Sequence, residues 1–292
     1  MTSVSLPIAP VSGRSSSDIP LSEKNFAEIA SIMLRDCGIE FSKTKQALIH
    51  SRLIKRLHAL RLQSFDEYCD LIRGDRGTEE RARMRDALTT NVTRFFREPH
   101  HFEHLRKHVL APAINRIKAG GRLRIWSAGC SSGQEPYSIA LTILDMLPDA
   151  RSYDVKILAT DISENVLGTA RNARYPIEEL EGIPVGMRRS WIESEAEHFR
   201  LDDAVKGLVT LKSLNLIGNW PMKGPFDAIF CRNVVIYFGE ATQVQIWQKM
   251  LPLLSPSGAV YIGHSERISG PAMSHFAVDG ITTYLVRKAA AA

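Results

Sequence analysis

The first third of the chain spaces its hydrophobic side chains as helices do. Apolar residues recur three or four positions apart in four segments, and no strand-like alternation interrupts them. These segments cover residues 22–38, 43–62, 64–74 and 78–90. The pattern predicts an all-helical domain over residues 21–118, within the usual size range of a domain.

The remainder, residues 119–292, alternates short strand-like runs with helical segments. The strand-like runs cover residues 122–129, 154–161, 207–216, 226–233, 258–264 and 281–288. This alternation predicts an α/β fold with a doubly wound, mainly parallel sheet. Ligands of such sheets bind outside the carboxyl ends of the strands.

Two stretches depart from this plan. Residues 174–213 include a connection that is too long for an ordinary loop. We expect an inserted β-subdomain there, with short antiparallel strands around "EHFRLD" and "LVTLKS". Residues 1–20 are rich in Ser and Pro and are expected to form a disordered tail.

Composition narrows the class of protein. Of the 292 residues, 44% are hydrophobic and 24% are charged, which is ordinary for a soluble globular protein. No apolar run approaches the ~20 residues of a membrane helix, so we expect no membrane insertion. The four cysteines lie far apart without metal-ligand or redox spacing. They predict free thiols in the cytoplasm and no metal site.

The positive charge is concentrated in the helical third. The net charge is +5, and residues 21–120 alone hold 19 Lys and Arg against 13 Asp and Glu. An acidic partner is therefore expected to meet this part of the chain first.

The stretch "SAGCSSGQEPYS", residues 127–138, links the first predicted strand to a helix. Its glycines let a ligand approach the backbone, and Asp161, at the end of the next strand, can accept ribose hydroxyls. A third glycine for a dinucleotide and a lysine for a triphosphate are both missing. Glu135 would repel a pyrophosphate but suits a cationic cofactor such as S-adenosylmethionine. The alternatives are that Glu135 only interacts favourably with the dipole at the start of its helix, and that Asp161 caps the helix beginning near Ser163.

Two further segments carry polar groups beside buried aromatics. "FDAIFCRNVVIYF", residues 226–238, runs from an apolar strand into Arg232, Asn233 and Tyr237. "NVTRFFRE", residues 91–98, joins the two predicted domains, and its Phe95 and Phe96 are expected in the core.

Together, "NVTRFFRE", "SAGCSSGQEPYSIAL", "ATDIS", "LNL", "FDAIFCRNVVIYF" and "GHSE" closely resemble the chemotaxis receptor methyltransferases of the CheR type. The resemblance covers residues 22–288. It implies a helical N-terminal domain, a Rossmann-like methyltransferase sheet and an inserted β-subdomain. It also implies methyl transfer from S-adenosylmethionine to glutamate side chains of chemoreceptors, leaving S-adenosylhomocysteine.

The resemblance also implies roles for individual residues. Arg97 and Tyr237 are the candidate catalytic groups, and no metal is implied. The candidate cofactor-binding residues are Asn91, Thr93, Arg97, Glu135, Asp161, Asn215, Leu216, Arg232 and Asn233. Asn215 and Leu216 are expected to border the adenine, and Arg232 and Asn233 to line the methyl-transfer cleft.

Two other functions remain to be weighed. The basic charge of the helical third suggests, as one alternative, a methyltransferase that acts on nucleic acid. However, such enzymes often carry a [DNS]-P-P-[YF] run at the position where this chain has "CRNV". A cofactor-binding module without transfer activity is disfavoured by the presence of Arg97, Asn233 and Tyr237. We therefore expect a receptor methyltransferase that does not bind nucleic acid and acts as a monomer.

A docking surface is predicted in the segment between Glu40 and Asp66, which holds six Lys and Arg and no acid. On a helix, Lys45, Arg52, Lys55 and Arg56 share an arc of about 100° beside an apolar stripe. We expect this arc to meet the acidic methylation region of the receptor, as the family resemblance implies. The alternative is an ordinary solvated helix face.

The predicted subdomain differs from one branch of the family. Members of that branch bind a peptide at the receptor's C-terminal end through a Gly-rich loop. The corresponding stretch here, "WIESEAEHFRLDD", has five acids, one Arg and no glycine. We expect an enzyme that does not depend on this tether, unless Gly182, Gly186 or Gly207 supplies the flexible loop.

Overall fold

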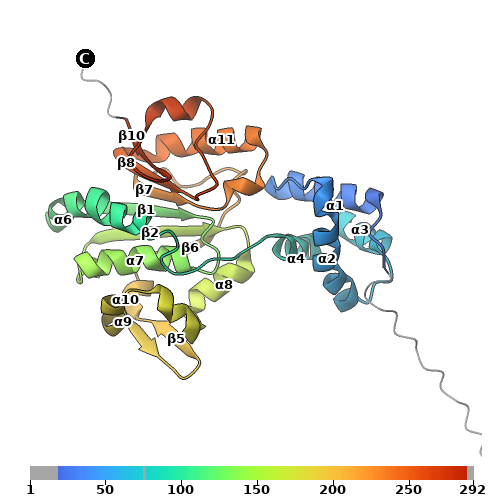
Figure 1. The fold of residues 1–292 in the computed structure, drawn as a ribbon, viewed down its shortest axis with the longest axis horizontal. Helices are drawn as coiled ribbons and strands as arrows, with labels where there is room; N and C mark the ends of the chain where they lie inside the picture. Colours follow the sequence, from blue (N-terminus) through green and yellow to red (C-terminus); the bar gives the residue numbers. More distant parts are fainter. Residues whose placement is uncertain (1–18, 75–76, 288–292) are drawn as a thin grey trace, which may run out of the picture. The chain divides into compact units, whose positions relative to one another are not determined.

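The computed structural model describes residues 19–74 and 77–287, so the predicted tail lies almost entirely outside the described residues. The chain forms two compact units (Figure 1). The first comprises residues up to Ile32 together with Phe41–Leu88, and the second comprises Met33–Glu40 and all residues from Thr89 onward. Among the described residues, no helix is both long and apolar enough to span a membrane.

The first unit is all-helical, as the hydrophobic spacing predicts. Its helices are α1 (Glu23–Cys37), the short η1 (Lys43–Lys45), α2 (Gln46–Leu60), α3 (Phe65–Arg73) and α4 (Thr78–Leu88). Ile49, Leu53 and Leu57 of α2 are fully buried, and so are Tyr68 and Ile72 of α3. The last turn of α1 belongs to the second unit, so the chain crosses between the units three times, after Ile32, Glu40 and Leu88.

The second unit is built on a seven-stranded mixed sheet with the order β6-β2-β1-β7-β8-β10-β9. Its strands are β1 (Arg122–Ala128), β2 (Asp154–Asp161), β6 (Val209–Ser213), β7 (Phe226–Cys231), β8 (Leu254–Ile262), β9 (Phe276–Val278) and β10 (Thr283–Val286). The pairings from β6 to β8 are parallel, and β10 runs antiparallel to both β8 and β9. The carboxyl ends of β1, β2 and β7 therefore meet at one edge.

Successive strand residues enter separate cores on the two faces of this sheet. Ile125 of β1 and Phe230 of β7 join the core that contains α7 (Gln134–Met146). Trp126 of β1 joins the opposite core, with α11 (Glu240–Met250) (Figure 1). Because side chains alternate along a strand, one continuous apolar run supplies both cores. The remaining short helices of the sheet domain are η4 (Ala150–Ser152), α8 (Glu164–Asn172), η6 (Val235–Tyr237), η7 (Leu251–Leu253) and η8 (Pro271–His275).

The helical residues before the sheet correct the predicted boundary at residue 118. They form α5 (His100–His104), the π-helical η3 (Leu105–Leu110) and α6 (Ala111–Lys118). Their buried side chains, including Phe102 and Leu105, join the core around α7. Helical periodicity does not tell which core an amphipathic helix covers, so these helices were expected in the wrong domain.

The inserted subdomain contains a three-stranded antiparallel sheet with the order β3-β5-β4. Its elements are β3 (Arg174–Pro176), η5 (Ile177–Gly182), α9 (Val185–Trp191), β4 (Ile192–Ser194), β5 (His198–Leu201) and α10 (Asp203–Lys206). The expectation of a strand at "EHFRLD" is met by β5. The expectation for "LVTLKS" was wrong, because this stretch forms β6 and pairs in parallel with β2 of the main sheet.

Candidate functional site

A cavity opens at the edge where β1, β2 and β7 end, and all its lining residues belong to the second unit. It holds about 930 Å³ of space free of protein atoms, part of it open to solvent. Every residue predicted to bind the cofactor or to act in catalysis lines it: Asn91, Thr93, Arg97, Glu135, Asp161, Asn215, Leu216, Arg232, Asn233 and Tyr237.

The turn after β1 forms the floor of this cavity. Gly129 has φ +77°, and a Cβ there would collide with Val234. The amides of Gly129 and Cys130 both donate to the carbonyl oxygen of Thr160 on β2, at 2.7 and 2.9 Å. Glycine is therefore required by both the backbone angle and the close packing.

The inserted subdomain holds the other end of the turn. The hydroxyl of Tyr175 on β3 donates to the carbonyl oxygen of Ser132 at 2.8 Å. A Cβ at Gly133, which has φ +99°, would lie 2.8 Å from that hydroxyl oxygen. The subdomain thus contributes to the shape of the cavity floor.

Asp161 ends β2 and is partly exposed. Its Oδ2 accepts from the amide of Ser131 at 2.8 Å, and its Oδ1 accepts from the amide of Ser163 at 3.0 Å. A carboxylate oxygen has more than one lone pair, so both oxygens retain acceptor capacity toward the cavity. The helix cap of α8 is Ser163 itself, whose hydroxyl accepts from Val166.

Glu135 lies in the first turn of α7 and is buried. Its Oε1 accepts from the Ser127 hydroxyl at 2.7 Å, and its Oε2 accepts from Arg232 Nη1 at 3.0 Å. Burial raises the pKa of Glu135, and the nearby Arg232 guanidinium opposes this rise. The Glu135 carboxylate is therefore engaged by protein groups and lies at the cavity wall together with its counter-ion.

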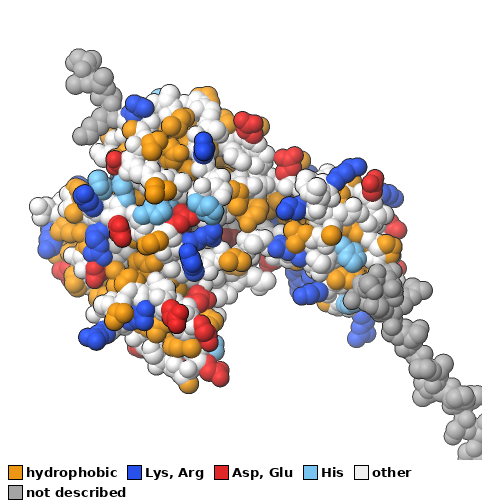
Figure 2. Space-filling model, in the orientation of Figure 1, with side chains coloured by type: hydrophobic (Ala, Val, Ile, Leu, Met, Phe, Trp, Pro, Cys, Tyr) orange, Lys and Arg blue, Asp and Glu red, His pale blue; other side chains and the backbone are white. Residues whose placement is uncertain are grey.

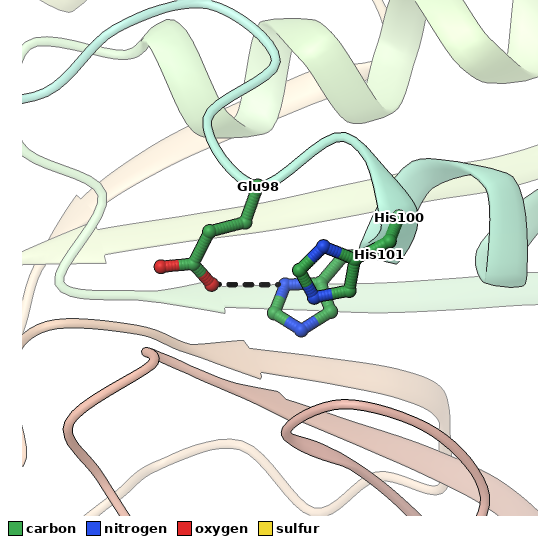
Figure 3. Close-up of side chains that lie close together, drawn as sticks. All are labelled: Glu98, His100 and His101. Carbon is green, nitrogen blue, oxygen red and sulfur yellow. Dashed lines mark ion pairs between the residues drawn. The ribbon is translucent and has the colours of Figure 1, made fainter.

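Arg232 joins two acids from different elements. Its side chain is 2% exposed, and its Nη2 lies 3.3 Å from Glu98 Oε2 and donates to the carbonyl oxygen of Arg97. Glu98 also faces the Nδ1 atom of His101, at 3.5 Å (Figure 3). Burial would raise the pKa of Glu98, but the charges of Arg232 and His101 and the hydrogen bonds from His264 and Arg232 together outweigh it, and the net shift is downward. We conclude that Arg232 fixes the end of the interdomain segment against α7.

That interdomain segment carries Asn91, Thr93 and Arg97. The Asn91 carbonyl oxygen accepts from the Ser131 hydroxyl at 2.9 Å, which ties the segment to the turn after β1. Arg97 Nη1 donates to the Val92 carbonyl oxygen at 3.2 Å. Phe95 is buried and Phe96 is partly buried in the core, as expected.

Glu266, which is 4% exposed, organises the loop after β7. Its carboxylate accepts from the amides of Gly263, Asn233, Val234 and Val235 at 2.6–2.9 Å. This loop includes Asn233, whose φ is +60°, and leads directly to Tyr237. The acid of the "GHSE" motif, Glu266, therefore has a structural role: it accepts hydrogen bonds from the backbone amides of this loop.

Asn215 connects the cavity to the end of α1. Its Nδ2 donates to the Asp36 carbonyl oxygen at 2.8 Å, and Cys37 and Ile39 of the same stretch line the cavity. From α11, Lys249 Nζ lies 4.2 Å from the centre of the Trp220 ring and donates to the carbonyl oxygen of Leu216 at 3.4 Å. Both contacts hold the loop that follows β6.

The predicted docking residues, of which Lys45 ends η1 and the other three lie on α2, divide into two pairs. Lys45 and Lys55 are exposed. Arg56 instead makes a two-fold contact with the buried Glu80, at 3.0 and 2.6 Å, and Arg52 Nη1 donates to the Leu88 carbonyl oxygen at 2.8 Å. The arginines therefore anchor α4, which the shared helical arc did not reveal.

Sequence reasoning missed several residues of the site. Glu98 and Glu266 end motifs that were recognised, but their partners come from distant elements. The local sequence around Cys37 and Ile39 gives no indication that they line the cavity.

The site suits a ligand with hydroxyl, cationic and flat apolar parts. It offers the acceptors of Asp161, the amides of Asn91 and Asn215, and the apolar surfaces of Ile39 and Leu216. The turn lacks the lysine and third glycine that a polyphosphate would favour. These donors and surfaces fit an adenosine carrying a cationic substituent.

Comparisons with known proteins agree with this geometry. Residues 91–285 match the CheR methyltransferase SAM binding domain, and residues 24–89 match the CheR methyltransferase all-alpha domain. A probable chemotaxis protein methyltransferase of Rhizobium etli is 53% identical over 254 residues, covering 85% of this chain and 94% of that protein. The chemotaxis protein methyltransferase of Salmonella typhimurium is 36% identical over 275 residues, covering 92% of both chains. That of Escherichia coli is also 36% identical over 275 residues, covering 92% of this chain and 93% of its own.

Proposed function

Because this chain belongs to the CheR family of S-adenosylmethionine-dependent protein-glutamate methyltransferases, we propose that it methylates glutamate side chains of bacterial chemoreceptors. The products are glutamyl methyl esters in the cytoplasmic methylation region, which adjust receptor output in chemotaxis. The observation that carries the proposal is the convergence of all the predicted cofactor and catalytic residues on one cavity.

When bound, S-adenosylmethionine supplies a methyl group activated by its sulfonium charge. We assign the ribose hydroxyls to Asp161, whose oxygens keep acceptor capacity. Leu216 and Ile39 provide apolar surface for the adenine. Glu135 and Arg232 form the polar wall for the amino-acid part.

The protein needs no strong general base for this reaction. The attacking glutamate carboxylate titrates near pH ~4.3 and is already an anion at neutral pH. The chain must therefore orient the carboxylate and exclude water from it. Three arginines, Arg94, Arg97 and Arg232, line the cavity, and Arg232 is committed to Glu135 and Glu98. Arg97 is the candidate for this contact because the family resemblance implies it. Tyr237 is the candidate for a second, hydrogen-bonding contact.

The test uses labelled S-adenosylmethionine and membranes that contain chemoreceptors. We expect base-labile label on the receptor, as methyl esters give. Tyr237→Phe should reduce the rate of labelling, whereas Tyr153→Phe, at a tyrosine that is not among the residues lining the cavity, should not. Label on nucleic acid instead of protein would contradict the proposal.

We further propose that receptor recognition does not require a C-terminal peptide tether. Strand β4 and the loop that joins it to β5 are acidic: Glu193 on β4 and Glu195 and Glu197 in the loop are all exposed. The two arginines nearby, Arg174 and Arg200, both pair with Glu195, at 2.8 and 2.9 Å. An acidic peptide would therefore meet uncompensated negative charge at this edge of the small sheet.

Calorimetric titration with C-terminal pentapeptides from the receptors of the same organism tests this second proposal. We expect no heat of binding at micromolar concentrations. Micromolar binding to any of these peptides would show that the tether is used, while leaving the methyl-transfer proposal intact.

A further inference from the structure

A cluster of two histidines and one aspartate lies away from the cofactor cavity. His104 ends α5, His108 follows one turn later in η3, and Asp279 lies in the turn between β9 and β10. His104 Nε2 is 3.0 Å and His108 Nδ1 is 3.8 Å from Asp279 Oδ2. One ligand atom from each residue lies within 4.8 Å of the other two. Histidine side chains gather on this face of the second unit (Figure 2).

The inner histidine is oriented from behind by a buried phenol. His104 Nδ1 lies 2.9 Å from the hydroxyl of Tyr261, and Tyr261 is fully buried on β8. The His104 side chain is only 10% exposed, and Nε2 is the ring nitrogen that faces Asp279. Histidines that bind metals usually donate their second N–H to a carboxylate, a backbone carbonyl or water, which fixes the tautomer and the ring plane. Here the hydroxyl oxygen of Tyr261 takes that place.

The local backbone is also unusual. Residues Leu105–Leu110 form a π-helical turn, a geometry found in well under 1% of residues. Such turns are frequent at functional sites. Here the two imidazole rings stack, with centroids 4.3 Å apart and planes 9° from parallel. His104 and His108 are four residues apart, so they lie on the same side of the helix, toward Asp279.

We propose that His104, His108 and Asp279 form a binding site for a divalent transition metal, of which Zn²⁺ is the representative. Two imidazoles and one carboxylate suit zinc and its neighbours, whereas magnesium and calcium prefer oxygen ligands alone. The three side chains supply three ligands, and water completes a four-coordinate shell. Small side-chain rotations bring all three ligand atoms to bonding distance of one ion. The expectation of no metal came from cysteine spacing and from the family resemblance, and neither considered this cluster.

A second group of possible ligands, Glu98, His100 and His101, is a poorer candidate. Figure 3 shows Glu98 already facing His101, and the guanidinium of Arg232 lies 3.3 Å from the same carboxylate oxygen. A fixed positive charge at that distance repels a dication. Among the described residues, no Lys or Arg side chain forms an ion pair with Asp279, although the charge of the exposed Lys107 helps burial to lower the pKa of His104. The metal is therefore assigned to this cluster.

The proposed metal would stabilise a junction that the protein already makes. His101, three residues before His104, contacts Thr282 Oγ1 at 3.0 Å and the Ile281 carbonyl oxygen at 3.2 Å. Both belong to the same turn as Asp279. A metal would add a second link between α5–η3 and this turn, so its role is structural and methyl transfer does not pass through it.

The test is zinc binding to the full-length protein after removal of metals with a chelator. Calorimetry should show one Zn²⁺ per chain, and saturating metal should raise the unfolding temperature of the second unit by about 5 °C or more. His108→Ala and Asp279→Asn, both at partly exposed positions, should each weaken the affinity at least tenfold. His275→Gln, at an exposed histidine of the same unit, should leave it unchanged.

Co²⁺ spectroscopy adds a readout that does not depend on stability. Four-coordinate Co²⁺ bound by nitrogen and oxygen gives visible d–d bands without a thiolate charge-transfer band, and His108→Ala should abolish them. Unchanged affinity in both variants, a thiolate band, or loss of binding on His100→Gln instead would overturn the assignment.

Discussion

At the scale of single residues, the acids of the site have different tasks. Glu266 accepts several backbone amides and shapes the loop after β7. Glu135 is paired with Arg232, and Asp161 alone combines backbone contacts with partial exposure to the cavity. Charge-assisted hydrogen bonds contribute about 1.5–3 kcal/mol each, so the exposed acceptor is the one through which a ligand gains most.

Asp161→Asn is therefore expected to weaken S-adenosylmethionine binding at least tenfold. The amide keeps the shape of the side chain and one acceptor oxygen, so the fold should persist. Asp154→Asn is the matched control, because Asp154 lies at the opposite end of the same strand. Calorimetric titration measures both variants, and equal affinities would refute the placement of the ribose.

His101 makes the second unit sensitive to acid. It is fully buried, and burial together with the charge of Arg232 lowers its pKa from about 6.5 to about 3. Between these values the unfolded chain binds more protons than the folded chain, so stability falls as the pH is lowered. From pH 7 to pH 5 the expected contribution is about 2 kcal/mol of unfolding free energy.

Urea unfolding of the wild type and of His101→Gln at pH 7 and pH 5 checks this prediction. The glutamine does not titrate, so the loss of stability at pH 5 should be about 2 kcal/mol smaller in the variant. His275→Gln should behave as the wild type does. An identical pH dependence in all three proteins would show that His101 is not the group responsible.

At the scale of elements, the sequence predicts which residues share one face of a helix better than it predicts which other element that face packs against. The helix arc of Lys45, Arg52, Lys55 and Arg56 could be derived from spacing, but which part of it faces α4 depends on where α4 packs. Arg56 meets the buried Glu80, which also accepts from the Tyr68 hydroxyl at 3.0 Å. One helix face thus serves both internal anchoring and an exposed charge.

Charge reversal at adjacent positions separates these two roles. Arg56→Glu leaves Glu80 without its counter-ion and should destabilise the first unit by about 3–5 kcal/mol. Lys55→Glu, at an exposed position, should leave stability within about 0.5 kcal/mol. Denaturant unfolding measures both, and equal stabilities would mean that the Arg56–Glu80 pair is not structural.

Because Arg52 and Arg56 are engaged within the helical unit, the docking prediction now rests on the exposed Lys45 and Lys55. Lys45→Glu together with Lys55→Glu should raise the Michaelis constant for receptor several-fold, chiefly at low salt, without changing cofactor affinity. Lys24→Glu, at an exposed position on α1, is the control for net charge. Unchanged receptor kinetics at low salt would exclude this face as the docking surface.

The positions of strands could be predicted from the local pattern of apolar residues. Which strands pair with each other could be predicted less well, because pairing joins segments far apart in the sequence. The strand ends that carry Asp161 and Arg232 follow from apolar runs and from the rule that ligands meet carboxyl ends. The strand that pairs with "LVTLKS" cannot be predicted in this way. The sequence of an edge strand is compatible with pairing either to the inserted subdomain or to β2. Likewise, the apolar face of α5–α6 does not specify that it covers β1 and α7.

At the scale of the whole molecule, the division into units separates cofactor binding from most of the helical domain. All lining residues of the cavity belong to the second unit, including Cys37 and Ile39 from the end of α1. The chain crosses between the units three times, after Ile32, Glu40 and Leu88. The first two crossings enclose residues 33–40, which supply Cys37 and Ile39 to the cavity, and the third leads into "NVTRFFRE".

Hydrogen exchange with and without S-adenosylhomocysteine should reveal this division. A ligand stabilises the unit that binds it, so protection should rise in residues 33–40, 89–97, 129–135 and 214–216. Residues 46–88 should exchange at unchanged rates, because none of them lines the cavity. Asp161→Asn at the same ligand concentration should lose the protection in the second unit and serves as the control. Protection that appears in α2–α4 would contradict the separation, and would mean that cofactor binding is coupled to the receptor-docking domain.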